Sequence, residues 1–268
     1  MLHERVWKNR LMLTYKVSGQ SHVGCVRRAN EDYIGWRVST DGRRALAVLA
    51  DGMGGHAGGA EASRIAVEAF IECAIDLMWR NVELSEYLIR ERLLDAAEAA
   101  NEAVCVERKL NEALSGMGTT LVAAFSYDGE ACVVHAGDSR CYLVSQSGEL
   151  RQLTRDDSVV QQMLDDGSIT EQDAPHVPYR NMLTKALGCQ EDLLFSCINV
   201  SLKEGERLLL CSDGLFNMLP HGVIGELASG VRPQEERVDS LIAATLNKGA
   251  EDNVSVLMVE VSGMAVDA

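Results

Sequence analysis

Five acidic positions share one feature: each stands where an apolar, strand-like run begins or ends. They are Asp51 after RALAVLA, Asp138 after ACVVHAG, Asp213 after RLLLCS, Asp252 before NVSVLMVEV, and the pair Glu31-Asp32 before YIGWRV. One aspartate at the end of a strand is usually a turn residue. Five such positions in one chain indicate instead that carboxylates meet at one edge of the folded domain.

Carboxylates that meet in one place must be neutralised by protons or cations. Two of them about 4 Å apart repel each other by roughly 4 kcal/mol at an effective dielectric constant of 20. A ligand set made only of oxygens selects hard ions, and the histidines show no HExxH or other zinc spacing. The pattern therefore predicts Mg²⁺ or Mn²⁺, and two such ions typically activate a water for attack on a phosphate ester.

The glycine-rich turn DGMGGHAGGAEAS follows the first of these strands and has two interpretations. Gly52, Gly54 and Ala57 satisfy G-x-G-x-x-A, the spacing of a dinucleotide site. The neighbouring Asp51 would repel a pyrophosphate, however, and the strand–helix–strand context is missing. We therefore expect the glycines to allow close backbone approach, so that a carbonyl beside Asp51 can join the ligand shell of an ion.

A phosphate also needs a cation that does not titrate. Arg27 and Arg28 directly precede Asn30-Glu31-Asp32, and a guanidinium can grip two phosphate oxygens at once. Motifs for a covalent nucleophile or for nucleotide hydrolysis are missing: the sequence contains no Cys-x5-Arg, no Asp-x-Asp-x-Thr, no GxxxxGK[ST] and no GxSxG. Activated water is the chemistry that remains.

Composition limits the class of protein. The chain has 268 residues, 47% of them apolar, and a net charge of −15, which is ordinary globular composition. This charge repels nucleic acid and argues against a two-metal nuclease, although it attracts divalent cations and basic peptides. The longest apolar run, ALAVLA, is far too short to span a membrane. Eight cysteines without a Cys-x-x-Cys pair or a secretory signal are typical of a reduced, cytoplasmic protein.

Short strands cluster in the sequence, and two helices lie side by side between them. The strand-like runs are LTYKVSG, DYIGWRV, RALAVLA, TLVAAFS, ACVVHAG, RCYLVSQ, RLLLCS and VSVLMVEV. Helical spacing or composition marks residues 60–80 and 85–114. This order predicts an α+β sandwich with helices on its outer faces rather than a parallel βαβ sheet.

Two hairpins and one long insertion complete the layout. The hairpins are expected around Asp128-Gly129 and Ser147-Gly148. Residues 151–190 are polar and irregular, so we expect a functional flap between core strands. The expected boundaries are a flexible extension at 1–12, a single domain at 13–262 and a tail at 263–268.

The ordered motifs resemble those of the metal-dependent protein serine/threonine phosphatases of type 2C, especially bacterial members. The motifs are VRRANED, LADGMGGHAGGAEAS, MGTTLVAA, VHAGDSRCYL, LTRDDS, RNMLTKALG, LLLCSDGLFNML and EDNVSVLMVE, and they cover nearly the whole chain. The resemblance implies an α-β-β-α sandwich of two antiparallel β-sheets flanked by helices, with the metals at one edge.

The resemblance also implies a set of metal ligands. Asp51, Asp213 and Asp252 match ligands of the first metal. The second metal would be held by Asp51, by the carbonyl of Gly52 and, through water, by Glu31. A third, weaker metal of bacterial members is held by an acid that matches Asp138, together with Asp213.

Other residues match the parts that handle phosphate and water. Arg27 falls on the phosphate-binding arginine, Asp32 resembles the acid that orients the attacking water, and Asn253 would support the ligands by hydrogen bonding. Arg28 is expected to be structural. His56 is the bacterial substitute for the histidine that donates a proton to the leaving group, and the alternative donor is a metal-bound water.

The flap departs from the usual bacterial pattern in two places. Asp157 stands where a histidine is common, and Val177 separates His176 from Pro178, which are normally adjacent. These changes leave the core motifs intact. Substrate preference and binding of the third metal are therefore expected to differ from those of the usual bacterial members.

The resemblance thus implies metal-dependent hydrolysis of phosphoserine and phosphothreonine in proteins through a bridging water, with no phosphoenzyme. The alternative is a pseudophosphatase that binds phosphoproteins without turnover, and it predicts missing metal ligands, of which none is found. The expected partners are phosphoproteins modified by a cognate kinase, with neither nucleic acid nor membrane. A monomer is the default expectation.

Overall fold

The computed structural model describes residues 12–55, 57–79 and 84–264. Of the predicted N-terminal extension only Met12 is described, and of the predicted C-terminal tail only residues 263–264; both parts belong to strands. His56 lies outside the described residues. None of the helices in the described ranges is long and apolar enough to cross a lipid bilayer.

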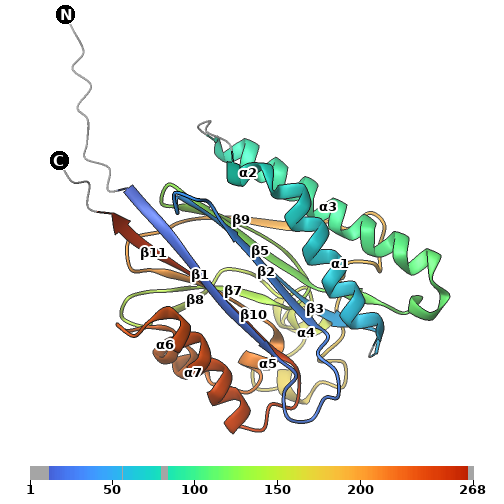
Figure 1. The fold of residues 1–268 in the computed structure, drawn as a ribbon. Helices are drawn as coiled ribbons and strands as arrows, with labels where there is room; N and C mark the ends of the chain where they lie inside the picture. Colours follow the sequence, from blue (N-terminus) through green and yellow to red (C-terminus); the bar gives the residue numbers. More distant parts are fainter. Residues whose placement is uncertain (1–11, 56, 80–83, 265–268) are drawn as a thin grey trace, which may run out of the picture.

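Two antiparallel β-sheets lie face to face in the centre of the molecule (Figure 1). The first sheet has the strand order β1-β11-β10-β7-β8, with bounds β1 (Met12–His22), β7 (Arg140–Val144), β8 (Leu150–Gln152), β10 (Arg207–Cys211) and β11 (Val254–Met264). The second has the order β2-β3-β5-β6-β9, with bounds β2 (Asp32–Val38), β3 (Arg44–Met53), β5 (Leu121–Tyr127), β6 (Glu130–Ala136) and β9 (Ser196–Ser201). The short β4 (Gly118–Thr119) pairs with the end of β3.

Helices cover the outer face of each sheet (Figure 1). The second sheet is covered by α1 (Ala57–Ala74), α2 (Asp76–Trp79) and α3 (Glu86–Leu110), followed by the 3-10 turn η1 (Glu112–Leu114). The first sheet is covered by α6 (His221–Ala228) and α7 (Gln234–Asn247). Three short helices lie near the shared sheet edge or in the flap: α4 (Val159–Asp165), η2 (Ala174–His176) and α5 (Asp213–Phe216).

Three apolar cores lie between these four layers, and strand β10 contributes side chains to two of them. Leu208 and Leu210 point into the core between the sheets, whereas Leu209 and Cys211 point into the core beneath α6 and α7. Side chains alternate across a strand, so a strand buried on both faces reads as a continuous apolar run. The observed architecture is the α-β-β-α sandwich, and the predicted fold class is confirmed.

The eight strand-like runs all form strands, and both hairpins occur where expected. Positive φ angles at Asp128 (42°) and Gly129 (82°) match the turn type that joins two antiparallel strands tightly. β9, α6 and α7 were not predicted from the sequence, and α1 ends at Ala74, within the single helix predicted over residues 60–80. The expected irregular flap contains α4, whose first turn is capped by the Ser158 side chain.

Candidate active site

Strands of both sheets bring the acidic residues to one edge of the sandwich. In the second sheet, Asp32 at the start of β2 pairs directly with Asp51 near the end of β3, and Asp138 follows β6. In the first sheet, Asp213 begins α5 directly after β10, and Asp252 precedes β11. Residues separated by 220 positions in the sequence thus face one another because two sheets meet at this edge.

The electrostatics show how closely these groups interact. Burial, then repulsion from Asp32, Asp213, Asp138 and Asp252, raises the pKa of Asp51 well above its usual range. Burial is also the first cause that raises the pKa of Asp32 and Asp138 to about 6 and that of Asp213 to about 7. Asp51, Asp138 and Asp213 keep some solvent contact, but most of what surrounds them is protein.

Few cations balance this charge. The Arg27 guanidinium contacts the Asp252 carboxylate at 2.7 Å, and both side chains remain partly exposed. Among the described residues, in their observed conformation, no group of three Asp, Glu, His or Cys side chains lies close enough together to hold a metal ion. The donor set nevertheless fits a hard divalent cation, because it consists of carboxylate and backbone oxygens that repel one another unless a cation neutralises them.

Glycines allow the backbone at Asp51 to pack closely against the Glu31 loop. The Gly52 N–H donates to the Glu31 carbonyl (3.1 Å), and a Cβ on Gly52 would lie only 2.0 Å from the Gly59 carbonyl oxygen. A Cβ on Gly59 would likewise lie 2.0 Å from Glu31 Oε2. This close approach is what the sequence predicted for the turn, and the antiparallel neighbours of β3 leave no strand–helix–strand unit for a dinucleotide.

Asn253 ties the Glu31 loop to the start of β11. Its Oδ1 accepts a hydrogen bond from the Glu31 N–H (2.8 Å), and its Nδ2 donates to the carbonyls of Val23 (2.9 Å) and Ala29 (3.0 Å). The side chain is buried, so these partners have little water as an alternative. Asn253 therefore holds the backbone on which both Arg27 and Glu31 depend.

Replacing Asn253 by alanine is expected to lower the affinity of this acidic site for Mn²⁺ by about 10- to 100-fold, as changes to groups that support metal ligands commonly do. The reason is that the loop carrying Glu31 loses three hydrogen bonds. Calorimetric titration with Mn²⁺ measures the effect. Asn199→Ala, at an exposed position on β9, is the control and should match the wild type; equal Mn²⁺ affinity of both variants would contradict the role of Asn253.

The remaining predicted residues lie around the same edge. The Asp32 carboxylate accepts a hydrogen bond from the Ser212 hydroxyl (2.7 Å), and Asn30 links Ser21 to the Asp32 N–H. Arg28 is exposed.

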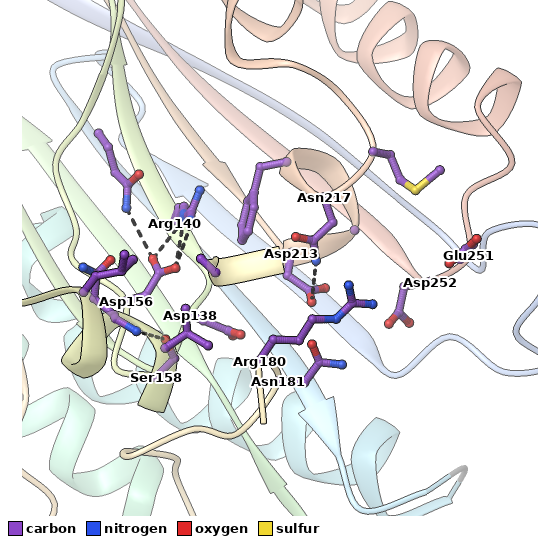
Figure 2. A pocket seen from close by; sticks show the side chains of 18 of the residues that line it. Asp138, Arg140, Asp156, Ser158, Arg180, Asn181, Asp213, Asn217, Glu251 and Asp252 are labelled. Carbon is purple, nitrogen blue, oxygen red and sulfur yellow. Dashed lines mark hydrogen bonds and ion pairs between the residues drawn. The ribbon is translucent and has the colours of Figure 1, made fainter. Parts of the chain in front are cut away.

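A cleft of about 860 Å³ opens beside the acidic cluster. Its walls include Arg27, Asp138, Asp213 and Asp252 on one side and the flap on the other. Figure 2 shows Arg180 reaching from the flap toward the Asp213 side of the cleft.

Sequence reasoning did not single out one ion pair in this cleft. Arg140 binds the Asp156 carboxylate through Nε (2.9 Å) and Nη2 (2.7 Å), and its guanidinium lies 3.6 Å from the centre of the Phe216 ring. In the sequence, Arg140 lies in the motif GDSR and Asp156 in the motif LTRDDS, but nothing there indicates that the two residues meet. The structure shows that they do, because β7 begins next to the flap. The pair forms the cleft wall next to Asp138 (Figure 2).

Comparison with known proteins identifies the family. A family model described as Protein phosphatase 2C matches residues 19–253. The chain belongs to the protein phosphatase 2C family. Its relatives include the serine/threonine phosphatase stp of Listeria innocua, 35% identical over 88% of this chain and 92% of the relative. Protein phosphatase PhpP of Streptococcus pneumoniae is 33% identical over 92% of this chain and 98% of the relative.

Solved phosphatase 2C structures show the same architecture. The Mycobacterium tuberculosis serine/threonine phosphatase PstP superimposes with a TM-score of 0.80 at 33% identity, covering 93% of this chain and 99% of that one. The PstP catalytic domain in complex with two manganese ions gives a TM-score of 0.79 at 34% identity, with the same coverage. This chain is accordingly a serine/threonine phosphatase of the bacterial phosphatase 2C type.

Proposed function

We propose that this phosphatase hydrolyses phosphoserine and phosphothreonine in proteins with two Mg²⁺ or Mn²⁺ ions and an activated water, without a phosphoenzyme. The observation that carries the proposal is the cluster of carboxylates beside the ends of five strands, in which burial and repulsion from the neighbouring carboxylates raise the pKa of Asp51 and of Asp213. Such a cluster is costly for a protein unless a cation is meant to bind there. The manganese ions bound to PstP support this choice.

The proposed ligands divide between the two ions. Asp51, Asp213 and Asp252 would hold the first ion, and Asp51, the Gly52 carbonyl and, through water, Glu31 would hold the second. Asp138 with Asp213 would hold a third. When bound, the ions would lower the pKa of a water, so that it attacks the phosphate ester at neutral pH.

The protein groups would then bind and orient the reactants. Asp32, fixed by the Ser212 hydroxyl, would orient the attacking water, and Arg27 would hold the phosphate oxygens. In this structure Arg27 is paired with Asp252. If Asp252 serves as a metal ligand, the guanidinium becomes free to bind the phosphate. For the leaving group, His56 and a metal-bound water remain the two candidate proton donors.

We propose that the substrates are phosphoproteins modified by a cognate serine/threonine kinase. We also propose that the phosphatase is a cytoplasmic monomer that binds neither nucleic acid nor a membrane. The net charge of −15 favours phosphosites flanked by basic residues. A pseudophosphatase is not favoured, because each carboxylate implied by the family pattern is present and lies at the same edge.

Hydrolysis of a phosphothreonine peptide tests the proposal. Wild-type protein with Mn²⁺ should release phosphate, and excess chelator or the substitution Asp213→Asn should reduce the rate by more than about 100-fold, since even groups behind metal ligands contribute 10- to 100-fold. Calorimetric titration with Mn²⁺ separates the alternative, because a pseudophosphatase that has lost metal binding shows no heat. Chelator-insensitive hydrolysis would refute the metal-dependent mechanism.

A further inference from the structure

Asp157 lies at the point where the flap leaves the core, next to the turn that carries Asp138. Its carboxylate Oδ2 accepts a hydrogen bond from the Gly137 N–H (3.2 Å), and its own N–H donates to the Gly137 carbonyl (2.9 Å). The Asp157 side chain is only 13% exposed. One residue of the flap thus satisfies both backbone groups of the glycine that precedes Asp138.

The same residue joins the two ends of the flap. The Asp157 carbonyl accepts a hydrogen bond from the Thr184 N–H (2.8 Å), and the neighbouring Val159 N–H donates to the Met182 carbonyl (2.9 Å). Lys185, just beyond the returning end, places its ammonium 2.9 Å from Asp157 Oδ1. The flap root is therefore a short two-stranded ladder, and Asp157 attaches this ladder to the Gly137 turn.

The Gly137 turn has little freedom of its own. Gly137 has a φ of 106°, and a Cβ there would lie 2.7 Å from the Thr120 side chain. Thr120 in turn binds the backbone of Asp51 in both directions, through its N–H to the Asp51 carbonyl (2.9 Å) and through its hydroxyl from the Asp51 N–H (2.9 Å). A continuous set of contacts consequently runs from Asp157 through Gly137 and Thr120 to Asp51.

Lys185 is the cation that balances Asp157. The other basic group nearby, buried His135, has its Nδ1 at 3.8 Å from Asp157 Oδ2, which is too long for a hydrogen bond. Burial also lowers the pKa of His135, which favours its neutral form. The ammonium of Lys185 therefore holds the Asp157 carboxylate in the position from which it accepts the hydrogen bond of the Gly137 N–H.

We propose that Asp157, held by Lys185, is a positioning residue: it fixes the Gly137 turn so that the Asp138 carboxylate faces Asp51 and Asp213, and it couples this carboxylate to the flap. The effect of Asp157 on catalysis rests on the proposed function, whereas its role in fixing the Gly137 turn does not. Movement of the flap root would then be transmitted to Asp138 through both contacts of Asp157 with Gly137, one made by its side chain and one by its backbone N–H.

Hydrogen exchange of the Gly137 amide in metal-free protein tests the geometric part without any phosphatase activity. Asp157→Ala should speed this exchange by roughly tenfold, the effect of losing about one hydrogen bond. Asp157→Asn keeps a carbonyl acceptor and should leave exchange nearer to wild type. The matched control is Asp165→Asn on α4, because Asp165 is likewise paired with a basic side chain, Arg155, while its hydrogen-bond partners among the described residues, Arg155 and Gln161, are not part of the Gly137 turn.

Activity against Mn²⁺ concentration tests the coupling to Asp138. Asp157→Ala and Lys185→Met should raise the Mn²⁺ concentration for half-maximal activity by about tenfold, and Asp165→Asn should not. If Asp157→Ala does not fold, Lys185→Met still tests the proposal because it leaves Asp157 in place. Unchanged Gly137 exchange in Asp157→Ala overturns the positioning role; faster exchange with unchanged Mn²⁺ dependence overturns the coupling to Asp138. Inactive wild-type protein with faster exchange in the variant would instead refute the proposed function alone.

Discussion

Replacing Asp51 by asparagine is expected to abolish most activity and, at the same time, to stabilise the metal-free protein. Asp51 is the acid proposed to touch both ions, so the Mn²⁺-dependent rate should fall by more than about 100-fold. Without metal, Asp51 is a buried carboxylate repelled by four others, and a neutral amide of the same shape removes that repulsion. The two effects have opposite signs because the binding site stores unfavourable electrostatic energy until a cation enters.

Thermal unfolding in the presence of chelator, together with peptide dephosphorylation in Mn²⁺, measures both effects. We expect the Tm of metal-free Asp51→Asn to rise by at least about 3 °C, since 1 kcal/mol shifts the Tm of a domain this size by about 2–4 °C. Asp239→Asn, at an exposed position on α7, is the control and should change neither quantity. A lower Tm for metal-free Asp51→Asn would show that the acidic cluster does not destabilise the fold.

The stability of the metal-free protein should fall as pH rises from about 5 to 8. The folded-state pKa values of Asp32 and Asp138 are raised to about 6 and that of Asp213 to about 7, mainly by burial. Between the ordinary carboxyl pKa near 4 and these values, the folded state keeps protons that the unfolded chain has already released, so stability decreases with pH across this window. For Asp138 alone, the increase in pKa from 3.8 to about 6 lowers the free energy of unfolding above pH 7 by about 3 kcal/mol relative to its value at low pH.

Metal ions should reverse this dependence. Mn²⁺ binds deprotonated carboxylates, so it competes with protons at pH 5 and replaces them at pH 8. The increase in Tm caused by Mn²⁺ should therefore be larger at pH 8 than at pH 5. His135, whose pKa is lowered by burial, acts in the opposite direction below about pH 6.5, but it is one group against several carboxyls.

Unfolding curves at pH 5, 6, 7 and 8, with chelator and with Mn²⁺, provide the measurement. Asp213→Asn should flatten the metal-free pH dependence because it removes the group that titrates at about 7. The account fails if metal-free stability increases with pH over this range, or if Asp213→Asn leaves the slope as it is.

Much of the fold follows from local patterns in the chain. Leu208, Leu209, Leu210 and Cys211 form one apolar run because β10 is buried on both faces, and such runs mark the central strands without further information. The Asp128-Gly129 hairpin was equally readable, since its backbone geometry favours these residue types. In contrast, β9 is a partly exposed edge strand with polar residues and α6 has only 8 residues, so their patterns were too weak to predict. α7, with 14 residues, has the length of an ordinary helix and was nevertheless not predicted.

The acidic residues show a similar division. Their types and their places beside apolar runs indicated one hard-metal site, because like charges brought together need a cation and oxygen ligands select a hard one. Which strands stand next to each other is decided by the sheet order, and the register opposes Asp32 to Asp51 although the sequence separates them by nineteen positions.

The sequence by itself determined the chemistry of this protein: the kinds of side chain, the glycines beside Asp51 and the arginine before Glu31. Only the tertiary structure decided the contacts that arise from bringing separate segments together, such as Arg140 with Asp156 and Asp157 with the Gly137 turn. Local periodicity reports burial and secondary structure one segment at a time. A contact between the flap and a turn twenty residues earlier depends instead on how both segments leave the packed sheets, and no short stretch of sequence contains that information.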